Sequence, residues 1–236
     1  MHAADHGTRR WRHDVPRRAN VHSPGRQRAE VSRAPNLLRR PQLRRAFARD
    51  GSDPTREPPF FFQKPTDAIQ LVPQGVTMDH PYPPVTKNYH YEVELVAAIG
   101  KRGSNIPADK ALDYVIGYAV GLDMTRRDLQ RMMGDQKKPE VGKSFDHAAV
   151  VSHLHPVANV GHLKQGAIWL KVNGETRQSA NIKDMIWSVA EQIANLSQYY
   201  ELFPGDIIYS GTPENVGPVV PGDVMEGHVM GCMGFG

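Results

Sequence analysis

The chain has 236 residues, of which 39% are hydrophobic and 23% are charged, so it is long enough to bury one sizeable core. It has no run of about 18 apolar residues, which argues against a membrane-spanning helix, and its start lacks the apolar segment of a secretory signal. The single cysteine, Cys232, excludes a disulfide within the chain and fits a reducing cytoplasm.

The net charge of +4 combines two unlike parts of the chain. Residues 1–50 hold thirteen arginines, no lysine and four acidic residues, a net charge of +9; residues 51–236 hold 16 basic and 21 acidic residues, a net charge of −5. The first part has little periodic apolar pattern, and we expect it to be disordered. Because no groove-reading motif or aromatic interleaving accompanies its arginines, nucleic acid is disfavoured as a partner.

Beyond the arginine-rich part, the composition becomes that of a folded domain. Residues 58–65 form a proline-bracketed aromatic run, which predicts an extended segment at a sheet edge or in the interior. A loop to about residue 84 precedes a predicted strand over 89–99, which is followed by a short helix over 107–114. Residues 115–122 are apolar and β-branched, which predicts a second buried strand.

The second half of the chain mixes helix and strand patterns. Residues 125–128 resemble a capping box with Thr125 as the N-cap of a helix, and Asn173-Gly174 predicts a type I′ hairpin turn between strands 168–172 and 175–178. An apolar spacing of three and four residues predicts an amphipathic helix over 182–196. Two further strands are expected after Pro-Gly turns, over 206–210 and 223–229. The pattern indicates an α+β domain that is rich in strands.

Two carboxylates on the first predicted strand indicate a chemical site. Glu92 and Glu94 share one face of that strand, because side chains at i and i+2 point the same way. Like charges in an apolar run are unfavourable unless something positive holds them. With Asp123, at the end of the next strand, they offer three oxygens of the kind that Mg²⁺ or Mn²⁺ prefers. The alternative is that each glutamate pairs with a lysine or arginine on a solvated face.

Two loops hold further candidates for the site. Lys143 lies in a loop with glycine and could offer a positive charge to a developing enolate, or it is an ordinary surface lysine. Thr212 lies in the loop 210–217. The Thr212 hydroxyl and the backbone N–H groups of this loop could bind a carboxylate, or the loop is a plain turn. The histidines lack zinc-finger spacing, and no serine-hydrolase elbow or nucleotide-binding Walker loop is present.

Five segments of the chain occur together in an order that resembles the fumarylacetoacetate hydrolase family, and in particular its bacterial fumarylpyruvate hydrolase-like branch. The resemblance covers roughly residues 51–227. Its motifs are specific in combination rather than singly. They are PFFFQKP at 59–65, YEVEL at 91–95, GLDMTRRDLQ at 121–130, GKSFD at 142–146 and SGTP at 210–213.

The resemblance implies a β-rich mixed roll over residues 51–236, usually a homodimer, of the fumarylacetoacetase C-terminal-domain type. It implies a divalent cation, Mg²⁺ or Mn²⁺ with Ca²⁺ as a third option. The residues that it implies are metal ligands Glu92, Glu94 and Asp123, and substrate contacts Gln130, Lys143 and Thr212, with Gln130 and Lys143 also catalytic.

The activity that the resemblance implies is hydrolysis of a C–C bond in a 1,3-diketo acid such as fumarylpyruvate or an acylpyruvate. The substrate would chelate the metal, water would attack one carbonyl, and the metal and Lys143 would hold the enolate that leaves. One alternative is decarboxylation or isomerisation of oxaloacetate-like or unsaturated dicarboxylic acids on the same metal. Another alternative is that this chain is a catalytically impaired protein that still binds metal.

The impaired alternative rests on a stretch that differs from the family pattern. The family has YCVGRNYAAHxxEMG before the Phe-rich segment, and its His and Glu resemble a dyad that activates water. Residues 37–51 stand in that place here, and neither His nor Glu occurs between residues 31 and 51. One set of codons for 37–51 reads YCVGRNYAAHSREMG when shifted by one base, so we hypothesise that residues 1–50 are an out-of-frame translation. The tail, 230–236, also lacks the apolar final strand that we expect. A similar out-of-frame translation or a truncation of the sequence would explain this.

Overall fold

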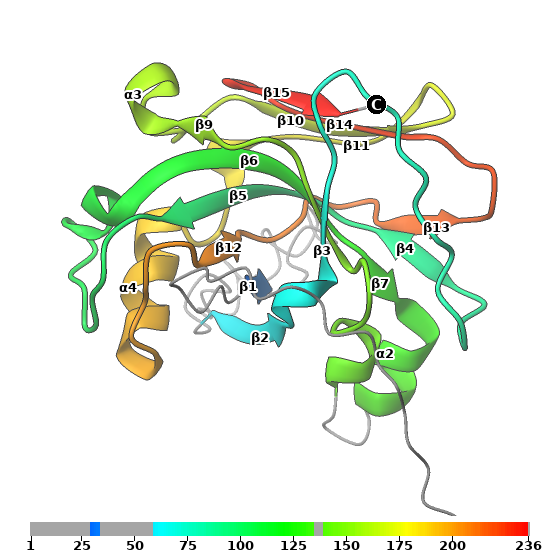
Figure 1. Cartoon of the computed structure of the whole chain (residues 1–236), viewed down its shortest axis with the longest axis horizontal. Helices are drawn as coiled ribbons and strands as arrows, with labels where there is room; N and C mark the ends of the chain where they lie inside the picture. The colour runs from blue at the N-terminus through cyan, green and yellow to red at the C-terminus, as the bar shows by residue number, and fades with distance from the viewer. Residues whose placement is uncertain (1–28, 34–58, 135–138, 236) are drawn as a thin grey trace, which may run out of the picture.

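The computed structural model describes residues 29–33, 59–134 and 139–235 of the chain. Its strands form three sheets (Figure 1), and the largest sheet is mixed because two of its strand pairs, β1 with β12 and β3 with β8, are parallel. In order across that sheet the strands are β2 (Phe60–Lys64), β1 (Ala29–Arg33), β12 (Ile207–Tyr209), β5 (Val93–Ile99), β6 (Val115–Asp123), β8 (Ala149–Val151) and β3 (Ile69–Leu71), with β9 (His155–Pro156) also paired to β6.

Two smaller sheets complete the fold. The four-stranded sheet has the order β11 (Glu175–Asn181), β10 (Ala167–Val172), β14 (Met225–Val229) and β15 (Cys232–Phe235). The three-stranded sheet has the order β13 (Gly217–Val219), β4 (Tyr89–Tyr91) and β7 (Thr125–Arg126). Among the described residues the α-helices are α2 (Arg127–Gly134), α3 (Val157–Val160) and α4 (Val189–Tyr199). The predicted α+β fold with many strands and few helices is confirmed.

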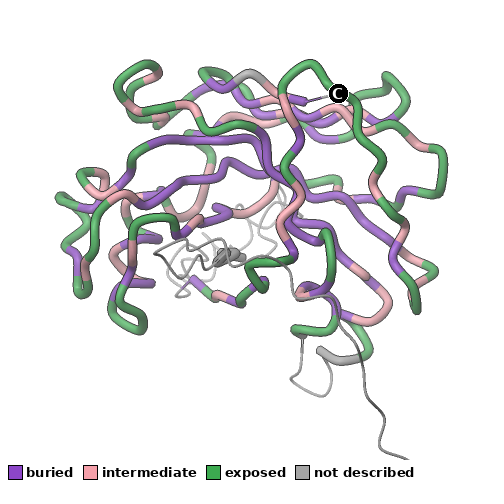
Figure 2. Tube along the Cα trace, in the orientation of Figure 1, coloured by how far each residue is buried: buried purple, intermediate pink, exposed green. Residues whose placement is uncertain are grey.

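The core lies around β5 and β6, the two long strands that cross the middle of the molecule. The four-stranded sheet packs over one face of this pair, with β10 against β5 and with β14 and β15 against β6 (Figure 1). Every residue of β5 is buried, and so is nearly all of β6 (Figure 2). A strand that is covered on both faces is mostly apolar on both, and in these two strands Glu94 and Asp123 are the charged exceptions.

The predicted strand over 89–99 is wrong in one respect, because it divides at Glu92 into β4 and β5. β4 pairs with β13 and β7 in the small sheet, and β5 pairs with β12 and β6 in the large one. Because both strands are buried on both faces, the sequence shows no change in polar–apolar alternation where β4 ends and β5 begins. The chain therefore leaves one sheet and enters another at a carboxylate.

Three helix predictions need correction. The segment 107–114 holds only a short 3₁₀ helix, η4 (Ala111–Tyr114). Thr125 lies in β7, where its hydroxyl donates to Asp123 O at 3.0 Å instead of capping a helix, and α2 begins at Arg127. The helix expected from residue 182 begins only at Val189, because Ser188 forms the capping box with Glu191.

The other predicted elements of the domain are confirmed. The aromatic run 58–65 contains β2, and the strand over 115–122 is β6, which ends at Asp123. The strands expected over 206–210 and 223–229 are β12 and β14. In the hairpin, φ is 53° at Asn173 and 78° at Gly174, the two positive values that a type I′ turn requires.

The two ends of the chain also hold strands. Within the first fifty residues the structure describes Ala29–Arg33, which is β1, between β2 and β12. The interpretation of the rest of that segment, including 37–51, lies outside the described residues and stays a prediction. The tail that was expected to lack a final strand forms β15 beside β14. No helix in the described part of the chain is both long and apolar enough to cross a membrane.

Candidate metal centre

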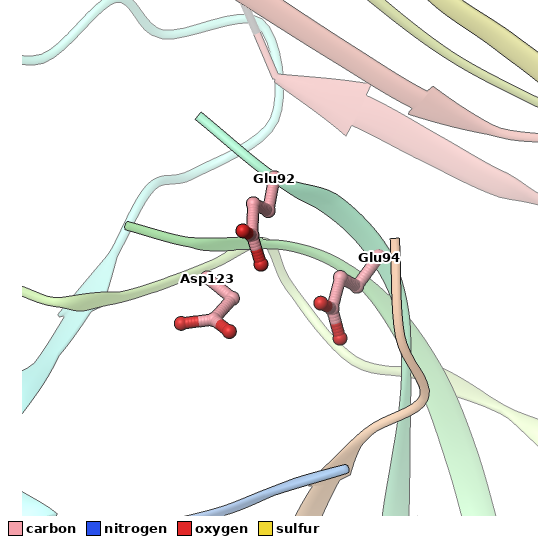
Figure 3. A group of neighbouring side chains, drawn as sticks. All are labelled: Glu92, Glu94 and Asp123. Carbon is pink, nitrogen blue, oxygen red and sulfur yellow. The ribbon is translucent and has the colours of Figure 1, made fainter. Parts of the chain in front are cut away.

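Three carboxylates meet where β4, β5 and β6 come together. Glu92 lies between β4 and β5, Glu94 lies in β5, and Asp123 is the last residue of β6. The Asp123 N–H donates to Glu92 O at 2.8 Å, so the two strands carry these residues side by side. One oxygen of each carboxylate lies within 4.8 Å of the other two (Figure 3). Each residue is 2% exposed or less, so the alternative of solvated surface glutamates is wrong.

Three buried cationic side chains contact two of these carboxylates. Lys143 Nζ lies 2.8 Å from Glu92 Oε2 and 2.5 Å from Asp123 Oδ2, so it is not a surface lysine. Lys64 Nζ lies 2.8 Å from Asp123 Oδ1, and Arg127 Nη2 pairs with Glu92 Oε1. The site thus holds as many cationic side chains as carboxylates.

The environment of Glu94 differs from that of the other two carboxylates. Its Oε2 accepts a hydrogen bond from Gly211 N–H at 2.7 Å, and no ion pair of the described residues involves it. Burial, followed by the charges of Asp123 and Glu92, raises the pKa of Glu94 well above its ordinary value. A divalent cation between the three carboxylates would relieve this repulsion. The donor set, three carboxylate oxygens close together, fits a hard cation such as Mg²⁺ or Mn²⁺.

Arg127 links Gln130 to the carboxylates. Its Nη1 donates to Gln130 Oε1 at 2.5 Å, while its Nε approaches His90 Nδ1 at 3.4 Å. His90 Nε2 lies 2.8 Å from Asn88 Oδ1, so its proton is directed there. Burial, followed by the charge of Arg127, lowers the pKa of His90 to about 4, which keeps this ring neutral at pH 7. Gln130 is therefore held at the edge of the site rather than on the carboxylates themselves.

Thr212 is brought to the site by the loop that follows β12. The preceding residue, Gly211, contacts Glu94, and its φ of 97° is a conformation that glycine adopts readily. Thr212 is partly exposed, and its Oγ1 accepts a hydrogen bond from Gln178 Nε2 at 2.9 Å. The structure therefore places all six residues singled out in the sequence at or beside one site, although their roles remain a prediction.

Residues 38–236 match the family described as fumarylacetoacetate (FAA) hydrolase C-terminal. The chain belongs to the fumarylacetoacetate hydrolase family. It is 50% identical over 180 residues to a fumarylpyruvate hydrolase of Ralstonia sp., a match that covers 76% of this chain and 91% of the relative. It is 39% identical over 176 residues to a mitochondrial oxaloacetate tautomerase of Homo sapiens, covering 74% of this chain and 78% of that one.

Solved structures of the family share this fold. A crystal structure of fumarylpyruvate hydrolase from Pseudomonas aeruginosa, in complex with Mn²⁺ and pyruvate, matches with a TM-score of 0.80. The two chains are 43% identical, and the match covers 91% of this chain and 96% of that one. The resemblance read from the five sequence segments is thereby confirmed at the level of the family and the fold.

Three residues of this family member's site were missed in the sequence. Lys64 had a signal, because it lies two residues from the buried Phe62 on the same face of a strand. Arg127 also had one, because it lies three residues before Gln130 on a helix. Gln178 had none, since it is one of several polar residues in its strand and its immediate neighbours are exposed.

A large cavity of the described residues lies apart from the carboxylates. It has a volume of about 940 Å³ and is lined by the segments 69–72, 76–82 and 219–225, together with Tyr89 and Leu122. None of the three carboxylates lines it, and neither does Lys143.

Proposed function

We propose that this protein is a metal-dependent hydrolase that cleaves a C–C bond in a 1,3-diketo acid, such as fumarylpyruvate or an acylpyruvate. The observation that carries the proposal is the cluster of three buried carboxylates, two of which pair with Lys143. The fumarylpyruvate hydrolase of Ralstonia sp., 50% identical, and the Mn²⁺ and pyruvate in the Pseudomonas aeruginosa structure support it.

The charges of the site fit a substrate with two carboxylates. Lys64, Lys143 and Arg127 match the charges of the three acidic residues. A divalent cation held by Glu92, Glu94 and Asp123 would leave two positive charges in excess. A dicarboxylate such as fumarylpyruvate carries two negative charges and would neutralise that excess. When bound, the cation would supply Lewis-acid polarisation of the carbonyl oxygens.

The proposed reaction consumes one water and needs no other reactant. The oxygen of water forms a bond to the acyl carbon, and the bond from that carbon to the central methylene breaks. The electron pair of that bond becomes the enolate of the departing keto acid, which then takes a proton at carbon. For fumarylpyruvate the products are fumarate and pyruvate.

Lys143 suits the stabilisation of that enolate. Its ammonium group has three hydrogens, of which two are directed to Glu92 and Asp123. The third can donate to an enolate oxygen, where a fixed positive charge in a buried site is most effective. Thr212 and Gln130 would contact the remaining substrate oxygens.

The activation of water distinguishes an active form of the enzyme, with the His/Glu dyad, from the chain as written. No His or Glu occurs between residues 31 and 51, where the family pattern has a dyad of these residues. The chain as written would then bind metal and substrate and turn over slowly. The oxaloacetate tautomerase of Homo sapiens favours a second candidate, isomerisation or decarboxylation of an oxaloacetate-like acid on the same metal.

A substrate panel with two versions of the chain tests the proposal. The first is the chain as written; in the second, residues 37–51 read YCVGRNYAAHSREMG. With Mn²⁺ or Mg²⁺ we expect the second chain to release pyruvate from fumarylpyruvate with a kcat/KM at least about 100-fold above the first. Glu94→Gln in the second chain is the control and should abolish turnover. Preferred turnover of oxaloacetate would select the second candidate, and turnover in the absence of any divalent cation would contradict the metal site.

We further propose that the protein acts in the cytoplasm as a homodimer, with Mg²⁺ or Mn²⁺ as its metal. Five exposed apolar side chains line the cavity described above, and a second copy of the chain could cover them. They are Leu71, Val76, Met78, Val220 and Val224. Light scattering on the purified chain should give twice its mass of 26.3 kDa. A mass of one chain at micromolar concentration would contradict the dimer.

A further inference from the structure

Gln178 lies in an outer strand, yet its side chain is fully buried. It belongs to β11, at the edge of the four-stranded sheet, and its neighbours Arg177 and Ser179 are both exposed. Leu170 pairs with Gln178 whereas Lys171 pairs with Thr176, so Arg177 is the extra residue of a β-bulge. Bulges redirect side chains, and this one accompanies the inward direction of Gln178.

The amide of Gln178 joins two segments that carry the site. Its Oε1 accepts the N–H of Val93, which stands between the two glutamates, at 3.0 Å. Its Nε2 donates to Thr212 Oγ1 at 2.9 Å and to Pro213 O at 2.9 Å, and it approaches Glu214 O at 3.2 Å. A single buried side chain thus ties the strand of the metal ligands to the loop of the substrate contact.

We infer that Gln178 is a positioning residue that makes Thr212 a hydrogen-bond donor to the substrate; this rests on the proposed function. An N–H from Gln178 occupies one lone pair of the Thr212 oxygen, so the hydroxyl hydrogen must point elsewhere. Gly211, which precedes Thr212, contacts Glu94 and so places Thr212 beside the metal ligands. The hydroxyl hydrogen of Thr212 is therefore available to a carboxylic acid bound there. Gln178 also holds the loop at a set distance from Val93.

The substitution Gln178→Glu separates positioning from packing. A carboxylate has nearly the same shape and can still accept the Val93 N–H, but it has no N–H to give to Thr212 or to the carbonyl oxygens of Pro213 and Glu214. The Thr212 hydroxyl would then turn to donate to the carboxylate, and the substrate would lose that donor. A side chain that only filled space would not distinguish an amide from a carboxylate in this way.

The test uses Mn²⁺ and pyruvate as probes and needs no turnover. Mn²⁺ affinity is measured by electron paramagnetic resonance, and pyruvate affinity of the Mn²⁺-loaded chain by titration calorimetry. We expect Gln178→Glu to weaken pyruvate binding about tenfold or more, while Mn²⁺ affinity changes less than about threefold. Ser179→Ala, on the exposed face of the same strand, is the matched control and should change neither affinity.

A double-mutant cycle with Thr212→Val shows whether the effect passes through Thr212. If Gln178 acts by orienting that hydroxyl, the double variant binds pyruvate no more weakly than Thr212→Val alone. Effects that simply add, or a Gln178→Glu variant that binds pyruvate as the parent does, would overturn the inference. A parent chain that binds Mn²⁺ but no pyruvate would instead overturn the proposed function, together with the substrate contact of Thr212.

Discussion

The two ends of the β5–β6 pair are filled by opposite chemistry. At one end Ala97, Ala98 and Ile99 are buried apolar residues that pair with residues 115–118 of β6. At the other end Glu94 and Asp123 bury charges in the same pair of strands. Apolar burial stabilises the fold, whereas a buried charge is tolerated only with a partner. The same pair of strands therefore has an apolar end that stabilises the fold and a charged end that carries the carboxylates. Substitutions can test whether these two roles are independent.

The largest effect on stability is expected at the apolar end. Ile99 is fully buried, and Ile99→Ala should lower the free energy of unfolding by about 2–5 kcal/mol, because it removes apolar contacts and leaves a cavity. Urea unfolding followed by circular dichroism measures the change. Ile99→Val, the graded control, should cost about 0.5–1.5 kcal/mol. A folded Ile99→Ala chain should keep its Mn²⁺ affinity; a large loss of affinity would mean that the two ends are coupled.

The converse result is expected at the charged end. Glu94→Gln should weaken Mn²⁺ binding at least about 100-fold, because it removes a ligand directly. In EDTA the same variant should be as stable as the parent or more stable, since a buried like charge is gone and the amide oxygen still accepts the Gly211 N–H. Glu214→Gln, at an exposed residue of the same loop region, is the control. A Glu94→Gln chain that is less stable than the parent in EDTA would contradict the assignment of Glu94 to metal binding rather than to fold stability.

A smaller loss of stability is expected where α4 begins. Ser188 caps this helix by accepting the Glu191 N–H, and Ile193 and Leu196 of the helix are buried in the core. Ser188→Ala should lower the free energy of unfolding by about 1 kcal/mol. Ser188→Asp keeps the cap and should restore most of that loss. Thermal unfolding of the two variants beside the parent measures the difference, and equal melting temperatures for Ser188→Ala and the parent would contradict the cap.

The smallest effect is a pH dependence at the start of α2. Burial opposes ionisation of Asp128, but hydrogen bonds from Lys87 N–H, the Thr86 hydroxyl and Leu129 N–H outweigh it and lower its pKa. A lowered folded pKa adds stability above the unfolded pKa of about 3.9, and this is lost as pH falls through the folded value.

The substitution Asp128→Asn measures this contribution. Because Asp128 is partly exposed and solvent screens its charge, the variant should be less stable than the parent by less than about 1 kcal/mol at pH 7. The gap should narrow below about pH 4, as Asp128 of the parent becomes protonated. Urea midpoints at pH 7 and pH 3 give the comparison. A gap that stays constant between these pH values would show that the charge of Asp128 is not the cause.

Local patterns predicted the elements whose causes are local. The hairpin turn at Asn173-Gly174 follows from positive φ angles that these residues tolerate, and β6 follows from an apolar run that includes β-branched residues. The helix start at Ser188 also has a local cause, the capping box with Glu191, but the prediction used only the apolar spacing from Ile182. Periodicity continues through a turn, whereas a cap marks where a helix begins.

The division at Glu92 and the contacts of Lys64 and Gln178 could not be read in the same way. Each depends on which strands become neighbours, and pairing between distant strands has no local pattern. Gln178 and Val93 are 85 residues apart in the chain, and Lys64 and Lys143 are 79 apart. Their contacts exist only because three sheets meet at one place.

By itself the sequence determined that the carboxylates of Glu92 and Glu94 would share a side, that Asp123 would end a buried strand, and that the domain would be rich in strands. These follow from side-chain geometry and apolar patterning, which act over a few residues. Only the tertiary structure decided that Lys64, Lys143 and Arg127 balance those charges and that Gln178 links the carboxylate-bearing strand to Thr212. The physical reason is that buried charges and amides must find partners, and packing alone determines which ones are within reach.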